Sequence, residues 1–364
     1  MLVIILKMNK IIISILSLIL TCFCKPVFAT RNTLPEDFIE LTSKIYKIPS
    51  EFNLSSGGAK TRENNKLLNH YPVIMISANK RSFRDWLGKN PGNADGETNV
   101  YRKSIKAGFM PEELWLYQYT EEGKEMRNME ELTDGLKLFI YAVLWYTKSN
   151  KVQILAHGEG GVLAQATIKK YNLYNLIHAV VCIAGPFHGS PKYTYTKALM
   201  GSPVCSSLAI GSDFLQDISL PDETPYNIFE KENGENIGVK YMTIYNGLPY
   251  GDDFFPNNPD SPSLLGAYNY ELNTLNHDGL RCSEKSSSIF IPFLSDDAIQ
   301  YNPLYDEDND GFMSDKFGGP DCNDNDSSIF PGAPEIPGDN IDQDCDDMDK
   351  LAVMGKDCSV PIKK

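Results

Sequence analysis

Short apolar segments of strand length recur along the chain, and most are separated by stretches long enough for a helix. Within these segments the apolar residues are continuous rather than alternating, which is typical of strands buried on both faces of a mainly parallel sheet. The segments lie at Tyr71–Ser77, Glu113–Tyr119, Val152–Ala156, His178–Ala184 and Val239–Tyr245, with a weaker sixth at Tyr270–Leu275. The pattern predicts an α/β fold with a mainly parallel sheet flanked by helices.

The longest amphipathic stretch, Glu130–Lys148, carries apolar residues at helical spacing. We predict a helix there, with Thr133 and Asp134 as candidate caps near its start. A second helix is expected through Gln165–Tyr171, and we interpret both apolar stripes as core packing. Thr30–His70 is polar and has no sustained period, so we expect an irregular lead-in with one short helix.

The third apolar segment ends in a sharp turn, within the sequence K-V-Q-I-L-A-H-G-E-G-G-V-L-A of Lys151–Ala164. A buried strand that turns sharply into a helix has the outline of a nucleophile elbow, which needs small residues two before and two after the nucleophile. Ala156 and Gly160 fill those two positions, and Gly158 stands at the centre. Glycine has no side chain, so the elbow lacks its nucleophile.

The acidic residues are unevenly distributed. The chain has 364 residues, 42% of them hydrophobic and 23% charged, which is ordinary for a globular protein. Its net charge is -14, and the segment from Asp306 to Asp349 holds fifteen acidic residues and one basic residue. The remaining chain is therefore neutral. This distribution argues against a nucleic-acid partner and favours cation binding at the acidic segment.

The N-terminus has the pattern of an export signal. Lys7 and Lys10 precede the apolar run Ile11–Leu20, and V-F-A at 27–29 suits a signal peptidase, so we predict cleavage after Ala29. Two alternatives are lipidation at Cys22 and retention of the run as an anchor. We expect a protein that is secreted, periplasmic or at the cell surface.

Cleavage would leave an even number of cysteines in an oxidising compartment, where disulfides persist. They are Cys182, Cys205, Cys282, Cys322, Cys345 and Cys358. The sequence alone does not pair them. Domain membership suggests Cys205 with Cys282 and Cys322 with Cys345.

Further motifs follow the elbow at the ends of predicted strands. In order they are A-H-G-E-G-G at 156–161, A-G-P-F-H-G-S-P at 184–191, D-D-F-F at 252–255, G-A-Y-N at 266–269 and N-H-D-G-L at 276–280. With these motifs, residues 71–293 resemble the class 2 (bacterial) lipases of the α/β-hydrolase superfamily. The resemblance implies the α/β-hydrolase fold, with nucleophile, acid and histidine in the order usual for that superfamily.

The resemblance assigns the three catalytic positions to Gly158, Asp252 and His277, with Asp253 as the alternative acid. A hydrolase of this kind needs an oxygen or sulfur at the elbow, which the histidine deprotonates while the acid orients the histidine. Loss of the nucleophile costs roughly a millionfold in turnover where it has been measured. We therefore expect a pseudoenzyme.

The resemblance also places an oxyanion hole, a set of backbone amides that stabilises negative charge on a substrate oxygen, at Ala78, Asn79 and Glu159. The family usually has His-Gly at this loop, whereas this chain has S-A at 77–78. Glu159 is also the one residue that would replace the missing nucleophile. Its carboxylate would serve as the nucleophile on an elbow shifted by one residue. That shift would put the bulky His157 where the turn needs a small residue.

The acidic segment has a regular spacing of carboxylates. D-E-D-N-D-G at 306–311 followed by Asp315 alternates carboxylates around a glycine, without the distant glutamate of an EF-hand. Residues 321–346, with two cysteines, resemble the bacterial MopE-type metal-binding repeat found on secreted and surface proteins. The candidate ligands are almost all oxygens, with no cluster of histidine or methionine, and this ligand chemistry favours calcium. The candidate ligands are Asp306, Asp308, Asp310, Asp315, Asp321, Asp324, Asp326, Asp342, Asp344 and Asp346.

These observations predict five parts: a signal peptide at 1–29, a lead-in at 30–70, a lipase-like α/β-hydrolase domain at 71–300, an Asp-rich module at 305–350 and a tail at 351–364. The first functional hypothesis is a catalytically impaired lipase homologue that binds a lipid, acyl or polymer ligand. The second is an ester hydrolase that works through Glu159 or another residue. The third is a calcium-dependent protein that contacts a cell surface or matrix.

Overall fold

The computed structural model describes residues 33–59, 67–124, 128–200, 203–227, 238–336 and 338–346. The described residues belong to a compact unit that begins at Thr33. The expected signal peptide at 1–29 and the tail at 351–364 lie outside the described residues. Within the described part of the chain, no helix combines the length and the apolar character needed to cross a membrane.

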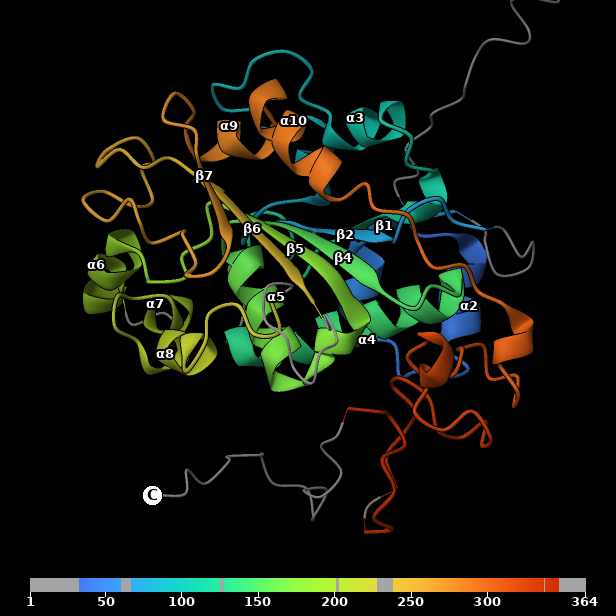
Figure 1. Cartoon of the computed structure of the whole chain (residues 1–364). Coiled ribbons are helices and arrows are strands. Elements are labelled where there is room, and N and C mark those ends of the chain that lie inside the picture. The colour runs from blue at the N-terminus through green and yellow to red at the C-terminus, as the bar shows by residue number, and fades with distance from the viewer. Residues whose placement is uncertain are drawn as a thin grey trace, which may run out of the picture. The chain divides into compact units, whose positions relative to one another are not determined.

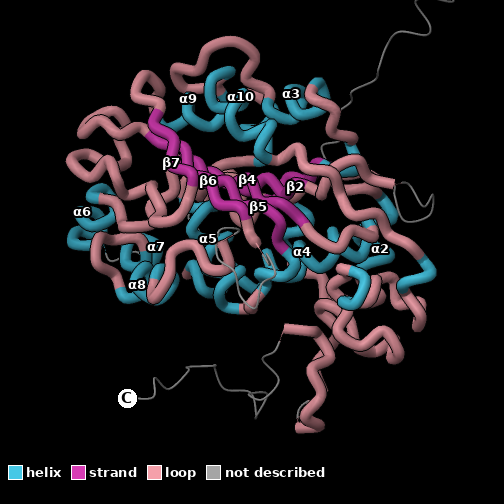
Figure 2. Tube along the Cα trace, viewed as in Figure 1, coloured by secondary structure: helices cyan, strands magenta, loops and turns pink. Residues whose placement is uncertain are grey.

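A seven-stranded sheet forms the centre of this unit, with strand order β1-β3-β2-β4-β5-β6-β7 (Figures 1 and 2). All neighbouring strands are parallel except β1, which is antiparallel to β3. The strands are β1 Ser56–Gly57, β2 Val73–Ile76, β3 Leu114–Tyr117, β4 Val152–His157, β5 Ile177–Ile183, β6 Lys240–Tyr245 and β7 Tyr268–Glu271. The predicted fold class and the first five predicted strands are confirmed.

Two differences concern the edges of the sheet. The strand expected at Tyr270–Leu275 begins and ends earlier, as β7, and all four of its residues are exposed, so no buried apolar run marked its position. The short strand β1 was not predicted because its two residues, serine and glycine, carry no apolar pattern.

Helices cover both faces of the sheet (Figure 1). Side chains alternate along the strands, so that Ile74 and Ile76 of β2 face one core while Val73 and Met75 face the other. The first core also contains residues of α2 Glu36–Thr42, α4 Met129–Thr147, α5 Glu159–Lys170, α7 Pro203–Ser207 and α8 Asp213–Ser219. The second contains residues of α3 Val100–Lys106, α9 His277–Cys282 and α10 Glu284–Phe293. Helix α6 covers Pro191–Met200, and 3₁₀ turns lie at Ser50–Leu54, Phe83–Leu87, Pro111–Glu113, Leu173–Leu176, Pro303–Tyr305 and Asp315–Phe317.

Both predicted helices are confirmed with changed bounds. The cap of α4 is Asn128, whose side chain accepts a hydrogen bond from the Glu130 amide at 3.3 Å, so the expected caps Thr133 and Asp134 were wrong. Those two residues lie inside the helix. Helix α5 begins at Glu159, directly after Gly158, and ends at Lys170, one residue before the expected end.

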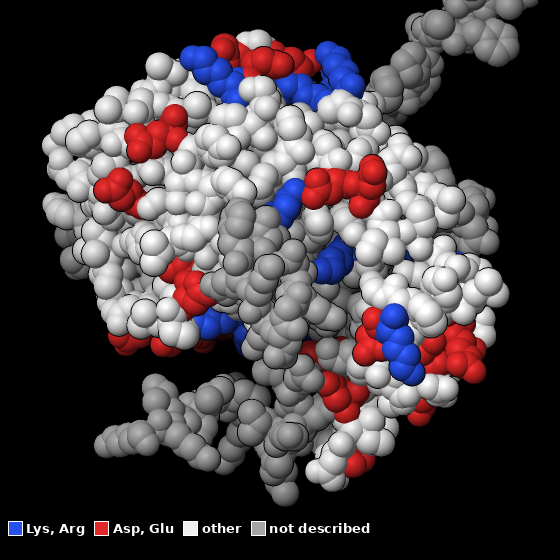
Figure 3. Space-filling view, in the orientation of Figure 1, with Lys and Arg blue, Asp and Glu red and all other residues white. Residues whose placement is uncertain are grey.

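The acidic segment packs against α4 and the residues that follow it. The Trp145 indole Nε1 donates to the Asp310 carbonyl at 3.2 Å, and the Asn150 side chain donates to the Gly318 carbonyl at 2.6 Å. Lys137 Nζ lies 3.8 Å from a carboxylate oxygen of Asp344. On the face shown in Figure 3, acidic side chains gather over this segment.

One of the two suggested disulfides is present. Cys322 and Cys345 are bonded across 23 residues. Cys282 is a buried free thiol 3.6 Å from the Pro91 carbonyl, so the suggested pair with Cys205 was wrong. The physical reason is the sheet, because Cys282 belongs to one core whereas Val204, the neighbour of Cys205, belongs to the other.

Candidate active site and acidic module

The candidate active site lies where four parallel strands end. Because β2, β4, β6 and β7 run in the same direction, their carboxyl ends meet at one edge of the sheet. The loop after β2 supplies Asn79, the turn after β4 supplies Gly158, and the loops after β6 and β7 supply Asp252 and His277. The structure brings these residues together with Glu159.

Asp252 and His277 form a buried pair. His277 Nδ1 lies 2.8 Å from Asp252 Oδ2, and Asp252 Oδ1 accepts a hydrogen bond from the Phe254 amide at 2.8 Å. Asp253 instead points outward, with Lys192 Nζ 3.8 Å from its carboxylate. The Phe254 ring stacks on the imidazole with 4.2 Å between centroids. This geometry fixes the ring and leaves Nε2 directed at the elbow.

The charges around His277 determine its protonation. Burial alone would lower the pKa of the imidazole, but the charge and hydrogen bond of Asp252, and then the charge of Glu159, raise the pKa above 6.5. The imidazolium form is therefore stabilised by two carboxylates.

Gly158 keeps the backbone of a nucleophile elbow. Its φ of 55° and ψ of -129° are sparsely populated for residues with a side chain, where such strain costs about 1–3 kcal/mol. A Cβ placed on Gly158 would lie 3.4 Å from His277 Nε2 and 3.1 Å from the Ala78 Cβ. A side chain at this position would thus face the imidazole. At Gly160 a Cβ would lie 2.7 Å from the Ser77 carbonyl oxygen, so only glycine allows this close approach between β2 and α5.

The Glu159 side chain turns back over the start of its own helix. Its Oε2 accepts a hydrogen bond from the Asn79 amide at 3.2 Å, and its carboxylate also accepts one from its own amide. The Tyr193 hydroxyl of α6 donates to Oε1. Burial raises the pKa of Glu159 above its ordinary value, and the two amides and the charge of His277 oppose that rise. Of the three amides expected to form the oxyanion hole, those of Asn79 and Glu159 thus donate to a carboxylate of this chain.

A second histidine supports the first. His157 Nε2 donates to the His277 carbonyl at 3.1 Å, and the two rings are 4.5 Å apart. Burial and then the neighbouring positive charges hold the pKa of His157 well below 6.5, so this ring is neutral and structural.

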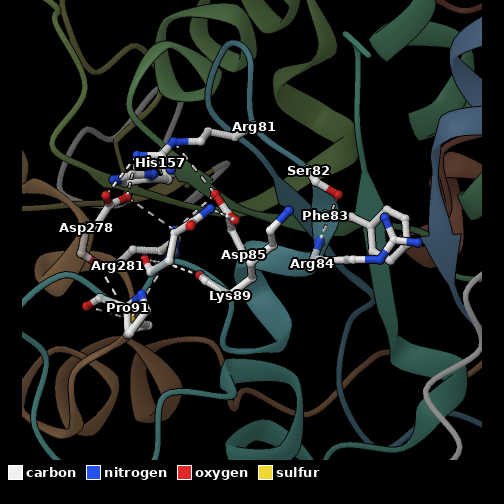
Figure 4. Close-up of polar contacts among 12 residues, drawn as sticks. Arg81, Ser82, Phe83, Arg84, Asp85, Lys89, Pro91, His157, Asp278 and Arg281 are labelled. Atoms are coloured by element: carbon white, nitrogen blue, oxygen red, sulfur yellow. Dashed lines mark hydrogen bonds and ion pairs between the residues drawn. The ribbon is translucent and has the colours of Figure 1, made fainter. Parts of the chain in front are cut away.

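An ionic network holds α9, which begins at His277 (Figure 4). Arg81 Nη2 lies 2.8 Å from a carboxylate oxygen of Asp278. The buried Arg281 reaches Asp85 at 3.3 Å and Asp278 at 3.6 Å. The network joins the loop after β2, which contributes Asn79, to the helix that contributes His277.

The acidic segment contains three groups of converging carboxylates. Within each group the oxygens lie within 4.8 Å of one another. The groups are Asp306, Asp308 and Asp324; Asp308, Asp310 and Asp321; and Glu335, Asp342 and Asp344. Asp315 and Asp326 are exposed and outside these groups, and Asp346 is buried beside Asp344.

The carboxylates in these groups fit a hard cation. Among the described residues, buried oxygens of Asp308, Asp310, Asp321 and Asp344 have no hydrogen-bond partner. Burial, followed by neighbouring carboxylates, raises the pKa of Asp310 and Asp344 to about 8 and that of Asp321 to about 7. A divalent cation bound by oxygen ligands would compensate these charges. The sulfur atoms of Cys322 and Cys345 are excluded as ligands because they form the disulfide.

Comparison with known families agrees with this geometry. Residues 70–231 match the family Lipase (class 2). Residues 321–349 match the Cu-binding MopE family, a metal-binding motif. The chain thus carries a lipase-like α/β-hydrolase domain and a MopE-type module. No curated protein sequence matches the chain.

A solved lipase structure shares the fold, and a second is reported beside it. Aspergillus fumigatus lipase B is 14% identical with a TM-score of 0.52, over 70% of this chain and 60% of that enzyme. The mature Bacillus licheniformis lipase BlEst2 is 16% identical with a TM-score of 0.45, over 62% of this chain and 92% of that enzyme. At such identities the likeness concerns the fold, and chemistry has to be argued from the site.

In the lipase-like site His277 can transfer a proton, but position 158 has no side chain to which a substrate's acyl group could be attached. Sequence reasoning missed Tyr193 as part of the site, because its position carries no pattern that distinguishes it from core or surface aromatics. Phe254 was recognised in the D-D-F-F motif, but its stacking on His277 was not predicted. Sequence reasoning also left Glu335 out of the metal ligands. Glu335 Oε1 accepts hydrogen bonds from the amides of Gln343 and Asp344, each at 2.9 Å, which fixes its carboxylate beside the third group.

Proposed function

We propose that the lipase-like domain is a catalytically impaired homologue that binds a lipid, acyl or polymer ligand. One observation carries this proposal: position 158 has the backbone of the elbow and faces His277 Nε2, yet it has no side chain. The imidazole can accept a proton, but there is no hydroxyl to activate and no atom to form an acyl-enzyme. The scaffold that shapes a ligand pocket does not depend on the nucleophile.

A second candidate is an ester hydrolase that uses Glu159 as its nucleophile. Its support is the burial of this carboxylate close enough to His277 for the two side chains to interact through their charges. Against it, the carboxylate oxygens accept hydrogen bonds from Asn79 and Tyr193, and the elbow is centred on Gly158 rather than on Glu159. A nucleophilic attack would require these contacts to break first.

For the MopE-type module we propose Ca²⁺. The donors in its three groups are all carboxylate oxygens, which suit a hard cation with a flexible coordination shell. We also propose that the protein is exported, as the basic and apolar N-terminal pattern predicts. A calcium-dependent contact with a cell surface or matrix is a third candidate, supported by the acidic face of this module.

The test combines turnover and binding on the mature protein in Ca²⁺. The p-nitrophenyl esters of butyrate and palmitate serve as substrates, and the ether 1-O-decylglycerol serves as a ligand without a cleavable ester. We expect no ester hydrolysis above buffer and a saturable rise of Tm with the ether. Hydrolysis that Glu159→Gln abolishes would instead establish the second candidate. Absence of binding together with calcium-dependent attachment to cells would favour the third.

A further inference from the structure

The Glu159 side chain is buried, although its place in the sequence gives no reason to expect burial. As the first residue of α5, it lies at the end of the helix where free amides point outward. A charged side chain at such an end is ordinarily solvated, yet this residue is only 5% exposed. Its carboxylate is enclosed by Asn79 of the β2 loop, its own amide and Tyr193 of α6.

The surroundings of this carboxylate match those that an ester hydrolase offers to a substrate oxygen. Two backbone amides, from the residue after the elbow centre and from the loop after β2, donate to it. The positive start of α5 and the charge of His277 add to its stabilisation. A carboxylate oxygen held by two amides carries the same charge and hydrogen bonds as the oxyanion of a tetrahedral intermediate.

We propose that Glu159 occupies the oxyanion hole of this domain and prevents an ester or acid carbonyl from binding there. The site is thereby inactivated twice, once by Gly158 and once by Glu159. This inference rests on the proposed function, because it concerns the same impaired site. It adds that the two amides form an intact carboxylate-binding site, which becomes available to a free ligand when the Glu159 side chain is removed.

One consequence separates this inference from the simple loss of a nucleophile. A serine introduced at position 158 would have its Cβ near His277 Nε2, but the carbonyl oxygen of an ester would find both amides occupied. Loss of one oxyanion donor costs about 10²–10³ in turnover. Gly158→Ser alone therefore remains at least about 100-fold slower than Gly158→Ser combined with Glu159→Ala.

The experiment measures covalent labelling by a p-nitrophenyl alkylphosphonate, which requires no turnover. In the labelling step the serine Oγ forms a bond to phosphorus, the bond from phosphorus to the p-nitrophenyl oxygen breaks, p-nitrophenolate leaves and the serine proton passes to His277.

Gly158→Ser is compared with Gly158→Ser/Glu159→Ala and with Gly158→Ser/Glu159→Gln. We expect rapid labelling of the Ala double variant alone, because Gln fills the same space and its oxygen still accepts from the amides. Glu131→Ala in the Gly158→Ser background, at an exposed position on α4, is the matched control and should label as slowly as Gly158→Ser.

The second measurement keeps Gly158 and uses butyrate as the probe. We expect butyrate to raise the Tm of Glu159→Ala and to leave that of the parent unchanged.

Equal labelling of Gly158→Ser and its Ala double variant, including no labelling of either folded protein, would overturn the inference. So would a Gln double variant as reactive as the Ala variant, since charge rather than occupancy would then be responsible, or a Glu159→Ala protein that does not respond to butyrate. Ester hydrolysis by the parent is a separate result and refutes the proposed function itself.

Discussion

His277 lies between two carboxylates, and each acts on it differently. Asp252 contacts Nδ1 directly, while Glu159 acts through its charge. Burial alone would lower the pKa of this ring, and the charges of Asp252, Glu159 and Asp278 raise it. Glu159 thus has two effects at once: it takes the hydrogen bonds of two amides and it favours the imidazolium.

Replacement of Glu159 by glutamine should lower the pKa of His277. Glutamine keeps the size of the side chain and removes its charge, so the fall follows from the lost attraction to the imidazolium. The pKa is read from the Cε1 proton of His277 in an NMR titration, with Glu131→Gln as the control for an exposed glutamate. An unchanged pKa in Glu159→Gln would show that Glu159 is protonated at neutral pH and contributes no charge.

The same shift has a consequence for stability. A histidine whose folded pKa exceeds its unfolded value of about 6.5 stabilises the fold fully below pH 6.5, and this contribution fades as the pH rises through the folded pKa. In Glu159→Gln the contribution should be smaller over that window. Urea unfolding at pH 6 and pH 8 measures the difference for both proteins.

At the scale of elements, α9 is a helix of only six residues that must hold the catalytic-position histidine. Its position depends on Arg281, which is 1% exposed and contacts Asp85 and Asp278. Arg281 Nη2 also donates to the carbonyl oxygens of Lys89 and Asn90, at 3.0 and 2.6 Å (Figure 4). The short helix is thus fixed by one buried guanidinium rather than by its own length.

Arg281→Met should destabilise the protein by about 3–5 kcal/mol, because it leaves the buried Asp85 without its main positive partner. Burial already raises the pKa of Asp85, and Arg281 is the largest influence that opposes it. Urea unfolding gives the free energy. Arg102→Met removes an exposed pair with Glu97 and should cost less than about 1 kcal/mol. A loss of similar size in both variants would contradict the assigned role, and adding Asp85→Asn to Arg281→Met should recover part of the stability.

The sequence was most informative about the parallel strands and least informative about side-chain direction. Continuous apolar runs are a direct consequence of burial on both faces, so β2 to β6 and the order of the catalytic positions could be predicted. The inward direction of Glu159 could not, because it depends on an amide from the loop after β2 and on a hydroxyl from α6. For the same reason the position of Cys282 on one side of the sheet was not apparent, and the pairing with Cys205 was wrong.

For the molecule as a whole, the acidic segment packs on the hydrolase domain as part of one compact unit. Its second group of carboxylates lies next to α4, where Trp145 Nε1 donates a hydrogen bond to the Asp310 carbonyl. Helix α4 in turn packs on the same core as α5. The folding of the module and the folding of the hydrolase domain are therefore coupled.

Ca²⁺ should therefore stabilise the whole unit and not the module alone. At 100 times its Kd, one bound ion adds about 2.7 kcal/mol to the free energy of unfolding. After bound ions are removed with EGTA, addition of Ca²⁺ should raise the Tm of a single unfolding transition. Tryptophan fluorescence measures this transition. Asp310→Asn should weaken this response, whereas Asp315→Asn, at an exposed carboxylate outside the groups, should keep it. Two separate transitions, with only the smaller one sensitive to Ca²⁺, would contradict the linkage.

The position of the Glu159 carboxylate also bears on how this chain could change over evolutionary time. A serine regained at position 158 would find the amides occupied, and a smaller residue gained at position 159 would free them with nothing to form an acyl-enzyme. The first substitution alone would give only a small part of the ester hydrolysis that both together give, and the second alone would give none. Two neighbouring positions in one turn thus make the loss of activity hard to reverse stepwise, although a laboratory double substitution at the same two positions would cross that barrier at once.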